Sequence, residues 1–453
     1  MHRFRIGENA ATAPRCGAAE GGNQLFPALG DGGYDMARYG LTLHGVPEAN
    51  YLKGAAVITA RATQDLSRFD LDLSGLWVRG ATVQGAKARY AREKDELLVT
   101  PAKPLNHGDT FTTVVTYDGT PRTVEDDDGS VEGWIETDDG STALGQPSGS
   151  MTWFPGNHHP SDKATYDITV TVPKAYDVVG NGELIEEIAE EGKGGAVTRH
   201  WRTEEPMATY LANISVGHFE IDRGRTADGL PVHIATDPDE AENAEEVKRL
   251  IPGIVGWANG RFGPYPFSST GAIVDHLPDL GYALETQTRP YFDEAPDEAL
   301  LVHELAHQWF GNSVTPREWK DIWLNEGLAT YAEWLWEEAH GGRTAGEVFE
   351  EFYDGTDPES EGIWSFPPAA PPGAGRVSDP PVYGRGAMAV HKVREAVGDQ
   401  RFFGILRTWT REHRHGNADT GQFIALCESR SGKELTDLFD VWLHEKGKPP
   451  RTR

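Results

Sequence analysis

The first half of the chain alternates between apolar and polar positions in short runs, which clusters of Gly, Pro and Asp separate. Between residues 34 and 236, short runs of alternating or β-branched side chains recur, which are typical of β-strands. Clear examples are residues 41–43, 56–59, 69–73, 111–115, 167–172 and 232–234. This pattern predicts an antiparallel β domain.

After Asp237 and Pro238 the period becomes helical, so we expect a domain boundary there. The pattern predicts helices at 240–261, at 297–310 and from 321 through 336, with short strands at 272–275 and 281–287. Residues 354–382 read as a long surface loop, and four further helical segments begin near 386, 399, 420 and 434. The expected organisation is a disordered N-terminus (1–24), a β domain (25–237) and a mainly helical domain (238–453), which together form an α+β fold.

Length, net charge and cysteine content restrict the kinds of domain, partner and metal site that we expect. A chain of 453 residues exceeds one ordinary core, in agreement with two domains. Its formal charge of -29 would repel phosphate backbones and anionic lipids, so we expect no nucleic-acid and no membrane partner. Cys16 and Cys427 alone form neither a disulfide framework nor a cysteine metal site. No apolar run is long enough for a signal peptide or a membrane span, and we expect a cytoplasmic protein that acts as a monomer.

One short segment carries metal-binding chemistry. His303 and His307 are four positions apart, so on an α-helix both imidazoles face the same side, while Glu304 lies beside them. Catalytic zinc commonly takes three protein ligands, and Glu326, on the following predicted helix, is the natural third. Two surface histidines on a solvated helix are the alternative. The apolar flanks at 300–302 and 305–306 disfavour it, since buried polar side chains need partners.

A zinc ion at this point would lower the pKa of a bound water to about 7 and polarise a peptide carbonyl. Glu304 is then placed to accept the proton of that water and pass it to the leaving amine. Histidine ligands usually donate their second N–H to an acceptor, for which Asp321, Glu333 or a backbone group are candidates. We therefore expect one zinc ion per chain.

The wider sequence goes beyond a generic metal helix. The strings HELAHQWFGN (303–312), WKDIWLNEGLATY (319–331) and FGPYPF (262–267) resemble the aminopeptidase N family of zinc peptidases, the gluzincins, which also include leukotriene hydrolase. The resemblance runs from about residue 32 to 447. It implies a saddle-shaped β domain followed by a thermolysin-like catalytic domain. Because the chain stops soon after LFDVWL (438–443), we expect no counterpart of the helical-repeat domain of larger members.

The resemblance also implies how a substrate is held. The family has an exopeptidase signature on an edge strand, where a Glu binds the free α-amine of the peptide. GYALET (281–286) resembles this signature, which implies that Glu285 binds the amine and that Gly281, Tyr282 and Ala283 contact substrate. Such a strand could take up the peptide as an extra strand. The segment departs from the family pattern around Glu285, which leaves the pocket for the first side chain open.

Two further positions follow from the same resemblance. YGRGA (383–387) resembles the element that carries the oxyanion-stabilising tyrosine, so Tyr383 is the expected transition-state hydrogen-bond donor. WFP (153–155) and DKA (162–164) are similar to family landmarks in the β domain. Counting back from Phe154, Gln146 falls at the position of a second amine anchor.

The expected activity is hydrolysis of the N-terminal peptide bond of peptides that have a free N-terminus. Three alternatives stay open on the same metal site: a zinc endopeptidase, an epoxide hydrolase, and a catalytically silent zinc scaffold that binds peptides. Glu285 distinguishes an aminopeptidase from the first two alternatives. If it binds the free α-amine, cleavage is restricted to the peptide bond next to the N-terminus. Glu304 and Tyr383 argue against the silent scaffold, which would not need them.

Overall fold

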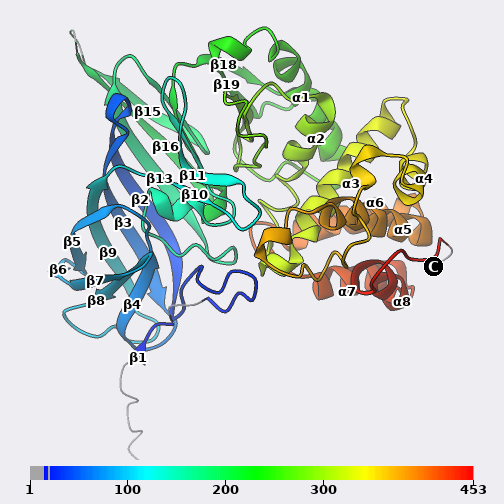
Figure 1. The fold of residues 1–453 in the computed structure, drawn as a ribbon, viewed down its shortest axis with the longest axis horizontal. Coiled ribbons are helices and arrows are strands. Elements are labelled where there is room, and N and C mark those ends of the chain that lie inside the picture. The colour runs from blue at the N-terminus through cyan, green and yellow to red at the C-terminus, as the bar shows by residue number, and fades with distance from the viewer. Residues whose placement is uncertain (1–14, 19–20, 191, 193, 452–453) are drawn as a thin grey trace, which may run out of the picture.

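The chain forms two domains that lie side by side, a β domain and a mainly helical domain (Figure 1). The computed structural model describes residues 15–18, 21–190, 192 and 194–451. Most of the expected disordered N-terminus, residues 1–14, 19 and 20, lies outside the described residues. Arg15 and Cys16 form the short strand β1, which pairs with β4 (Leu66–Asp72), so the expected disorder does not hold for these two residues.

The β domain contains three sheets among the described residues. The largest has eight strands in the order β15-β16-β13-β2-β3-β9-β5-β6. Its strands are β2 (Tyr34–Val46), β3 (Tyr51–Ala62), β5 (Trp77–Val83), β6 (Ala86–Lys87), β9 (Thr110–Gly119), β13 (Lys163–Pro173), β15 (Glu183–Ala189) and β16 (Ala196–Ala208). All pairs are antiparallel except β13 with β2, which run parallel. The strands predicted at 41–43, 56–59, 111–115 and 167–172 all belong to this sheet.

Two smaller sheets complete the β domain. One has the order β1-β4-β8-β7 and the other β10-β11-β12-β17-β14. Their strands are β4 (Leu66–Asp72), β7 (Arg89–Glu93), β8 (Glu96–Thr100), β10 (Thr123–Glu125), β11 (Val131–Glu136), β12 (Ser141–Leu144), β14 (Asp177–Gly180) and β17 (Ile214–Gly217). Along β13, the buried positions Tyr166, Ile168 and Val170 alternate with half-exposed ones, so each inward side chain adds apolar burial to the shared core.

A fourth sheet belongs to the helical domain. It has the order β18-β19-β20-β21, with β18 (Glu220–Arg225), β19 (Pro231–Thr236), β20 (Thr270–Val274) and β21 (Tyr291–Phe292). β19 pairs in parallel with β20, so this sheet joins residues on both sides of the boundary expected near residue 237. Since a division there would split the sheet, we propose that the second domain begins near residue 218.

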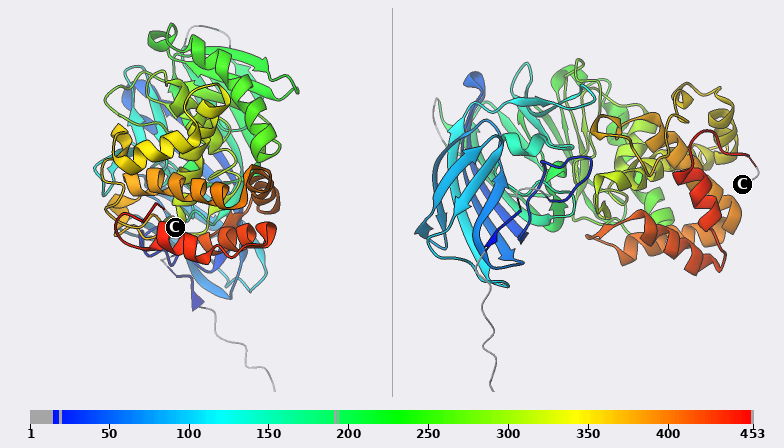
Figure 2. Two further views of the ribbon diagram at one scale, coloured as in Figure 1. Left: turned by 90° about the vertical axis from the view of Figure 1, so that its right-hand side faces the viewer. Right: turned by 60° about the horizontal axis from the view of Figure 1, so that its bottom comes forward.

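The helices follow this sheet in the chain and lie on the opposite side of the molecule from the large sheet of the β domain (Figure 1, Figure 2). They are α1 (Glu245–Phe262), α2 (Glu298–Ala306), α3 (Trp323–Ala339), α4 (Ala345–Asp354), α5 (Gly386–Val397), α6 (Asp399–Glu412), α7 (Thr420–Ser431) and α8 (Thr436–Phe439). A two-stranded pair, β22 (Thr315–Pro316) and β23 (Asn417–Ala418), ties the segment after α2 to the start of α7. A π-helical turn, Pro381–Arg385, leads into α5.

Three predicted elements differ from the structure, and one helix of the structure was not predicted. α1 begins at Glu245, because Pro238–Glu240 forms a separate turn capped by Asp237. α2 ends at Ala306 and the chain continues in tight turns to Gly311, whose φ is +124°. The predicted strand at 281–287 is absent except for a bridge between Leu284 and Tyr291. α4 was not predicted, although Thr344 and Glu347 form a capping box ahead of its apolar residues.

The missing strand has a physical reason. Apart from the bridge at Leu284, backbone groups of this segment bond to side chains and not to a neighbouring strand. Gly281, with φ +78°, donates its N–H to Asp293 Oδ2 at 2.7 Å, and the Glu285 carbonyl accepts from Asn312 Nδ2 at 2.6 Å. The segment is therefore an irregular loop that side chains hold at Gly281 and at Glu285. The predicted strand is therefore wrong at every residue of this segment except Leu284, while the addition of a peptide along it stays a prediction.

Asn181 holds this loop from the β domain. It is buried, and its Nδ2 donates to the carbonyls of Leu211 at 3.0 Å and Gln287 at 2.7 Å. Its Oδ1 accepts the N–H of Asn213 at 2.7 Å. One amide therefore joins β-domain segments to a residue two positions after Glu285.

We expect Asn181→Ala to lower the free energy of unfolding by about 2–4 kcal/mol, because three buried backbone groups lose their partner. Urea unfolding followed by tryptophan fluorescence measures this change. Asn243→Ala is the matched control, since Asn243 is exposed and its side chain bonds to Glu240 at 3.3 Å. Equal stability of the two variants would contradict the role of Asn181.

Candidate active site

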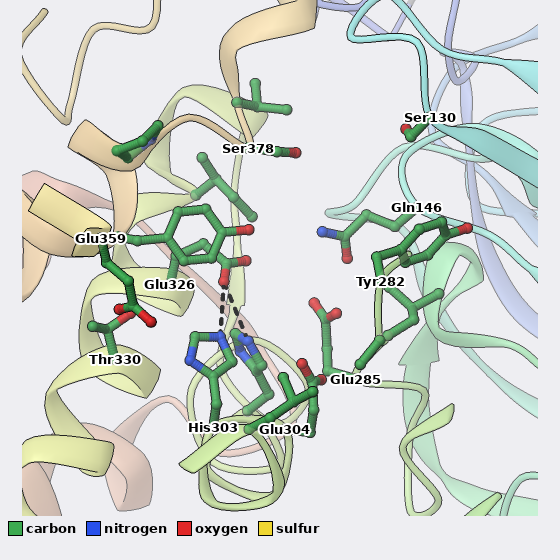
Figure 3. A pocket seen from close by; sticks show the side chains of 18 of the residues that line it. Ser130, Gln146, Tyr282, Glu285, His303, Glu304, Glu326, Thr330, Glu359 and Ser378 are labelled. Carbon is green, nitrogen blue, oxygen red and sulfur yellow. Dashed lines mark hydrogen bonds and ion pairs between the residues drawn. The ribbon is translucent and has the colours of Figure 1, made fainter. Parts of the chain in front are cut away.

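A cleft of about 790 Å³ separates the β domain from the helices. The β domain contributes Ser130 and Gln146, and the helical domain contributes the loop around Glu285 together with α2, α3 and the turn that holds Tyr383. Figure 3 shows these side chains converging from both domains. The expected metal ligands, catalytic residues and substrate-binding residues all line this cleft: Gln146, Gly281, Tyr282, Ala283, Glu285, His303, Glu304, His307, Glu326 and Tyr383.

Two imidazoles and one carboxylate meet at a single point. The Nε2 atoms of His303 and His307 each lie 3.3 Å from the same oxygen, Glu326 Oε2 (Figure 3). α2 supplies both histidines because residues four apart share a helix face, and α3 brings Glu326 back against that face. All three side chains are buried.

The other ring nitrogens are already committed to acceptors. His303 Nδ1 lies 2.6 Å from Glu333 Oε1, and His307 Nδ1 lies 3.0 Å from the Phe310 carbonyl oxygen. Each Nδ1 therefore carries the hydrogen, and in the neutral ring each Nε2 points a lone pair at the Glu326 oxygen. Such an arrangement is stable only with positive charge between the three atoms.

The pKa shifts of the two histidines and of Glu326 also indicate that positive charge is favoured at this point. Burial lowers the pKa of His307, but Glu326 and Glu285 outweigh this effect and raise it to about 9. Burial also lowers the pKa of His303, yet hydrogen bonds to Glu326 and Glu333 bring it well above its usual value. For Glu326, burial raises the pKa while the two imidazoles lower it to about 2. The cluster therefore favours either two extra protons or one divalent cation.

These residues fit a zinc ion. Tetrahedral zinc, with bonds of about 2.0–2.1 Å to nitrogen and oxygen, separates two of its ligands by about 3.3 Å. That is the separation of both Nε2 atoms from Glu326 Oε2. Two imidazoles and one carboxylate are also a donor set of catalytic zinc sites, which keep a fourth place for water or substrate.

The groups behind the histidines agree in part with the sequence analysis. Of the three candidates for the second N–H, Glu333 and a backbone carbonyl serve, as the contacts of His303 and His307 above describe. Asp321 does not, because its carboxylate instead accepts from the N–H and the hydroxyl of Thr420, at 3.1 and 2.6 Å. It thereby holds the start of α7.

Glu304 has a free acceptor oxygen beside the metal ligands. Its carboxylate lies within 4.8 Å of ring nitrogens of His303 and His307. The buried Oε2 atom has no hydrogen-bond partner in the part of the chain that the structure describes. Burial raises the pKa of this carboxyl, against the opposing effect of the imidazoles. A buried acceptor with a raised pKa is suited to taking up a proton.

Glu285 lies on the other side of the metal ligands. It is 3% exposed, and its carboxylate lies within 4.8 Å of His307 and Glu326. In the amide orientation that satisfies both groups, Gln146 donates to the two oxygens of Glu285 at 2.8 and 3.2 Å. Burial raises the pKa of Glu285 to about 8, with an opposing effect from His307. This buried carboxyl group is held by a neutral amide and faces the open cleft (Figure 3).

Tyr383 closes the opposite wall. Its ring is nearly parallel to that of His303, at 18° and 6.0 Å between centroids. Burial, followed by the charges of Glu326, Glu285 and Glu304, raises the pKa of its hydroxyl well above the usual value. The hydroxyl therefore stays protonated and can donate a hydrogen bond.

Sequence reasoning missed the residues that fix the Glu285 loop. Besides Asn312, which bonds the Glu285 carbonyl, Gln308 Oε1 accepts the N–H of Thr288 at 2.8 Å. Both residues lie in the string HELAHQWFGN. Their amide side chains, next to the metal ligands in sequence, were the available signal for such a supporting role. Asp128, Ser130, Glu359 and Ser378 also line the cleft from loops without a recognisable pattern.

Comparison with known proteins matches both halves of the chain. The model of the Peptidase M1 N-terminal domain matches residues 35–211, and that of the Peptidase family M1 domain matches residues 283–442. A solved M1 zinc metallopeptidase from Deinococcus radiodurans superimposes with a TM-score of 0.84 and 30% sequence identity, covering 95% of this chain and 98% of the other. A variant of it bound to a Tyr-Ser-Ala substrate gives a TM-score of 0.83 at 29% identity, covering 95% and 99%.

Curated relatives are longer. Glutamyl aminopeptidase of Bos taurus is 27% identical over 330 residues, which are 67% of this chain and 34% of that protein. Probable aminopeptidase 2 of Sulfurisphaera tokodaii is 26% identical over 324 residues, which are 66% and 40%. The chain thus spans well under half the length of these relatives.

The chain belongs to peptidase family M1, a family of zinc metallopeptidases. The resemblance inferred from the sequence and the α+β fold are both confirmed, and zinc is the cofactor that the family indicates. Among the described residues, no helix combines the length and the apolar character needed to cross a bilayer.

We expect Glu333→Gln to weaken zinc binding about 10- to 100-fold, because His303 loses a charged acceptor that fixes its ring. Competition with a chromophoric chelator measures the affinity. Glu337→Gln, on the same helix, is the control, since that carboxylate bonds Arg343 at the surface. Unchanged zinc affinity in Glu333→Gln would show that the contact does not support the metal site.

Proposed function

We propose that this chain is a zinc-dependent aminopeptidase that removes the first residue of peptides with a free N-terminus. The observation that carries the proposal is the closeness of Glu285 to the metal ligands, within 4.8 Å of His307 and Glu326. In an amino acid residue the α-amine and the carbonyl group are bonded to the same carbon. A carboxylate this close to the metal can therefore hold the amine of the very residue whose carbonyl is attacked.

Zinc held by His303, His307 and Glu326 would supply the Lewis acid that polarises the scissile carbonyl and the attacking water. Glu285 and Gln146 bind the substrate ammonium, which satisfies a carboxylate that burial otherwise penalises. The Gln146 amide can turn its oxygen toward the ammonium, since an amide offers both donors and an acceptor. This anchoring sets the register of the peptide in the cleft.

Glu304 then moves the proton. Its free Oε2 accepts a proton from the attacking water and delivers it to the nitrogen of the leaving peptide. As the tetrahedral centre forms, its oxygen gains negative charge, and the Tyr383 hydroxyl donates a hydrogen bond to that oxygen. Both groups act on atoms of the reaction itself, so both are proposed as catalytic residues.

The printed names of the relatives support the same activity, since the curated ones above are aminopeptidases and one solved relative holds a three-residue substrate. We further propose that the enzyme acts as a monomer. Both walls of the cleft come from one chain, so the proposed mechanism needs no second copy.

We expect Glu304→Gln to reduce kcat at least about 10³-fold while zinc stays bound at one ion per chain, because the amide cannot accept the proton. Hydrolysis of a panel of aminoacyl fluorogenic amides, read beside elemental analysis, measures both. Removing zinc with a chelator should abolish wild-type activity, and adding zinc should restore it. Activity that survives in Glu304→Gln would exclude Glu304 as the base.

We expect the wild-type enzyme to cleave a free-amine peptide and to spare its N-acetylated twin. Glu285→Gln should lower kcat/KM for the free peptide about 100-fold, equivalent to about 2.7 kcal/mol, because the ammonium loses its charged partner. Glu294→Gln, an exposed carboxylate near the same loop, is the control. Equal rates on both peptides would favour a zinc endopeptidase, and opening of an epoxide without peptide cleavage would favour a hydrolase of that class.

A further inference from the structure

A second group of acidic side chains lies in the β domain, away from the cleft. Asp72 ends β4 and Glu96 begins β8, and the two are directly opposite each other in the antiparallel pair. Asp31, in the loop before β2, joins them. One carboxylate oxygen from each residue lies within 4.8 Å of the other two.

This carboxylate trio is buried without a counter-ion. Asp31 is 5% exposed and Asp72 is 1% exposed, while Glu96 is half-buried. Among the described residues, none of the three takes part in an ion pair. The nearby cations have other partners: Arg68 pairs with Asp70 at 3.1 Å, and Arg92 donates to the carbonyls of Leu73 and Leu76.

Unused acceptors point to a ligand. Asp31 Oδ1 and Glu96 Oε2 are buried and have no hydrogen-bond partner in the described part of the chain. The second oxygen of Asp31 lies 3.2 Å from the Tyr34 hydroxyl, which also donates to the Asp70 carbonyl at 2.6 Å. Asp72 Oδ2 accepts the N–H groups of Gly30 and His158, at 3.1 and 3.0 Å. The two bonds to Asp72 fix the orientation of its carboxylate, while one oxygen of Asp31 and one oxygen of Glu96 stay unpaired.

Three buried carboxylates at this distance repel one another, and leaving their oxygens unpaired adds a desolvation cost. Burial, with added repulsion from Asp72 and Glu96, raises the pKa of Asp31 well above its usual value. Either protons held on the carboxyls or a bound cation can relieve this repulsion. A carboxyl proton would need an acceptor with good geometry, whereas a cation uses every unpaired oxygen at once.

We propose that Asp31, Asp72 and Glu96 bind a divalent cation of the calcium type. All of the donors are oxygens, which suit a hard cation and not the nitrogen and sulfur preference of zinc. Calcium binds oxygen at about 2.4 Å, so two of its ligands can be up to about 4.8 Å apart, the span within which the three oxygens lie. Half-buried Glu96 leaves a way in from solvent, and water completes the coordination.

The site connects to the cleft through the loop that carries Asp31. In the same loop, the ring of Phe26 packs edge-on against Trp319 at 5.8 Å, and Trp319 lines the catalytic cleft. A cation on Asp31 ties this loop to β4 and β8. It therefore holds a part of the β domain that touches the wall of the cleft.

The test uses zinc-loaded protein, so that added calcium does not fill the peptidase site. Calorimetric titration with CaCl₂ should give one binding event per chain, and saturating CaCl₂ should raise Tm by on the order of 5 °C. Asp31→Asn and Glu96→Gln should each weaken calcium binding at least 10-fold and reduce the shift in Tm. Glu242→Gln, an exposed carboxylate far from the trio in sequence, should bind calcium like the wild type.

Protons on the trio would give the opposite pattern. In that case calcium would leave Tm unchanged, and Asp31→Asn and Glu96→Gln would be as stable as the wild type or more stable without metal. Calcium binding that persists equally in both variants would place the ion elsewhere. Either result would overturn the proposal. The two substitutions are tested separately, so that one unstable variant does not remove the test, and MgCl₂ in parallel shows whether the site discriminates by ion size.

Discussion

Charge balance among buried side chains is the constraint on which the catalytic centre depends. Two imidazole nitrogens face one carboxylate oxygen at 3.3 Å, and both imidazoles are fixed from behind by acceptors. Without a cation the lone pairs of the two nitrogens repel the carboxylate oxygen. With a cation, these three atoms become its ligands. The apolar flanks of α2 keep water away and so strengthen this requirement. Metal binding and folding of this region are therefore linked.

The loop around Glu285 shows how a specific function is added to this general metal centre. It has almost no regular structure, yet Asn181, Gln308 and Asn312 satisfy its backbone groups from three directions. Such support lets an irregular segment hold a carboxylate at a set distance from the metal. The amides come from both domains, so the position of the amine anchor depends on how the two domains pack.

Much of the site could be predicted because its chemistry is local. His303, Glu304 and His307 share one helix face by spacing alone, and the flanking strings carried Glu326, Glu285 and Tyr383. The structure brings all of these residues into one cleft, although their roles stay predictions. The sequence predicted a strand at 281–287 from the short apolar run at residues 282–284, while side chains distant in the sequence decided the outcome. α4 was not predicted because it directly precedes the long acidic and Pro-rich stretch that was interpreted as a loop. The capping box of Thr344 and Glu347 was the available signal for this helix.

The sheet that crosses the expected boundary affects how the catalytic half can be studied. β18 and β19 come before residue 237, yet they form one side of the sheet whose other strands are β20 and β21. A recombinant fragment that starts at residue 238 would expose the edge of β20, which is buried at all five positions in the whole protein. Exposed apolar edges recruit other chains. Such a fragment would therefore tend to aggregate before its metal chemistry could be measured.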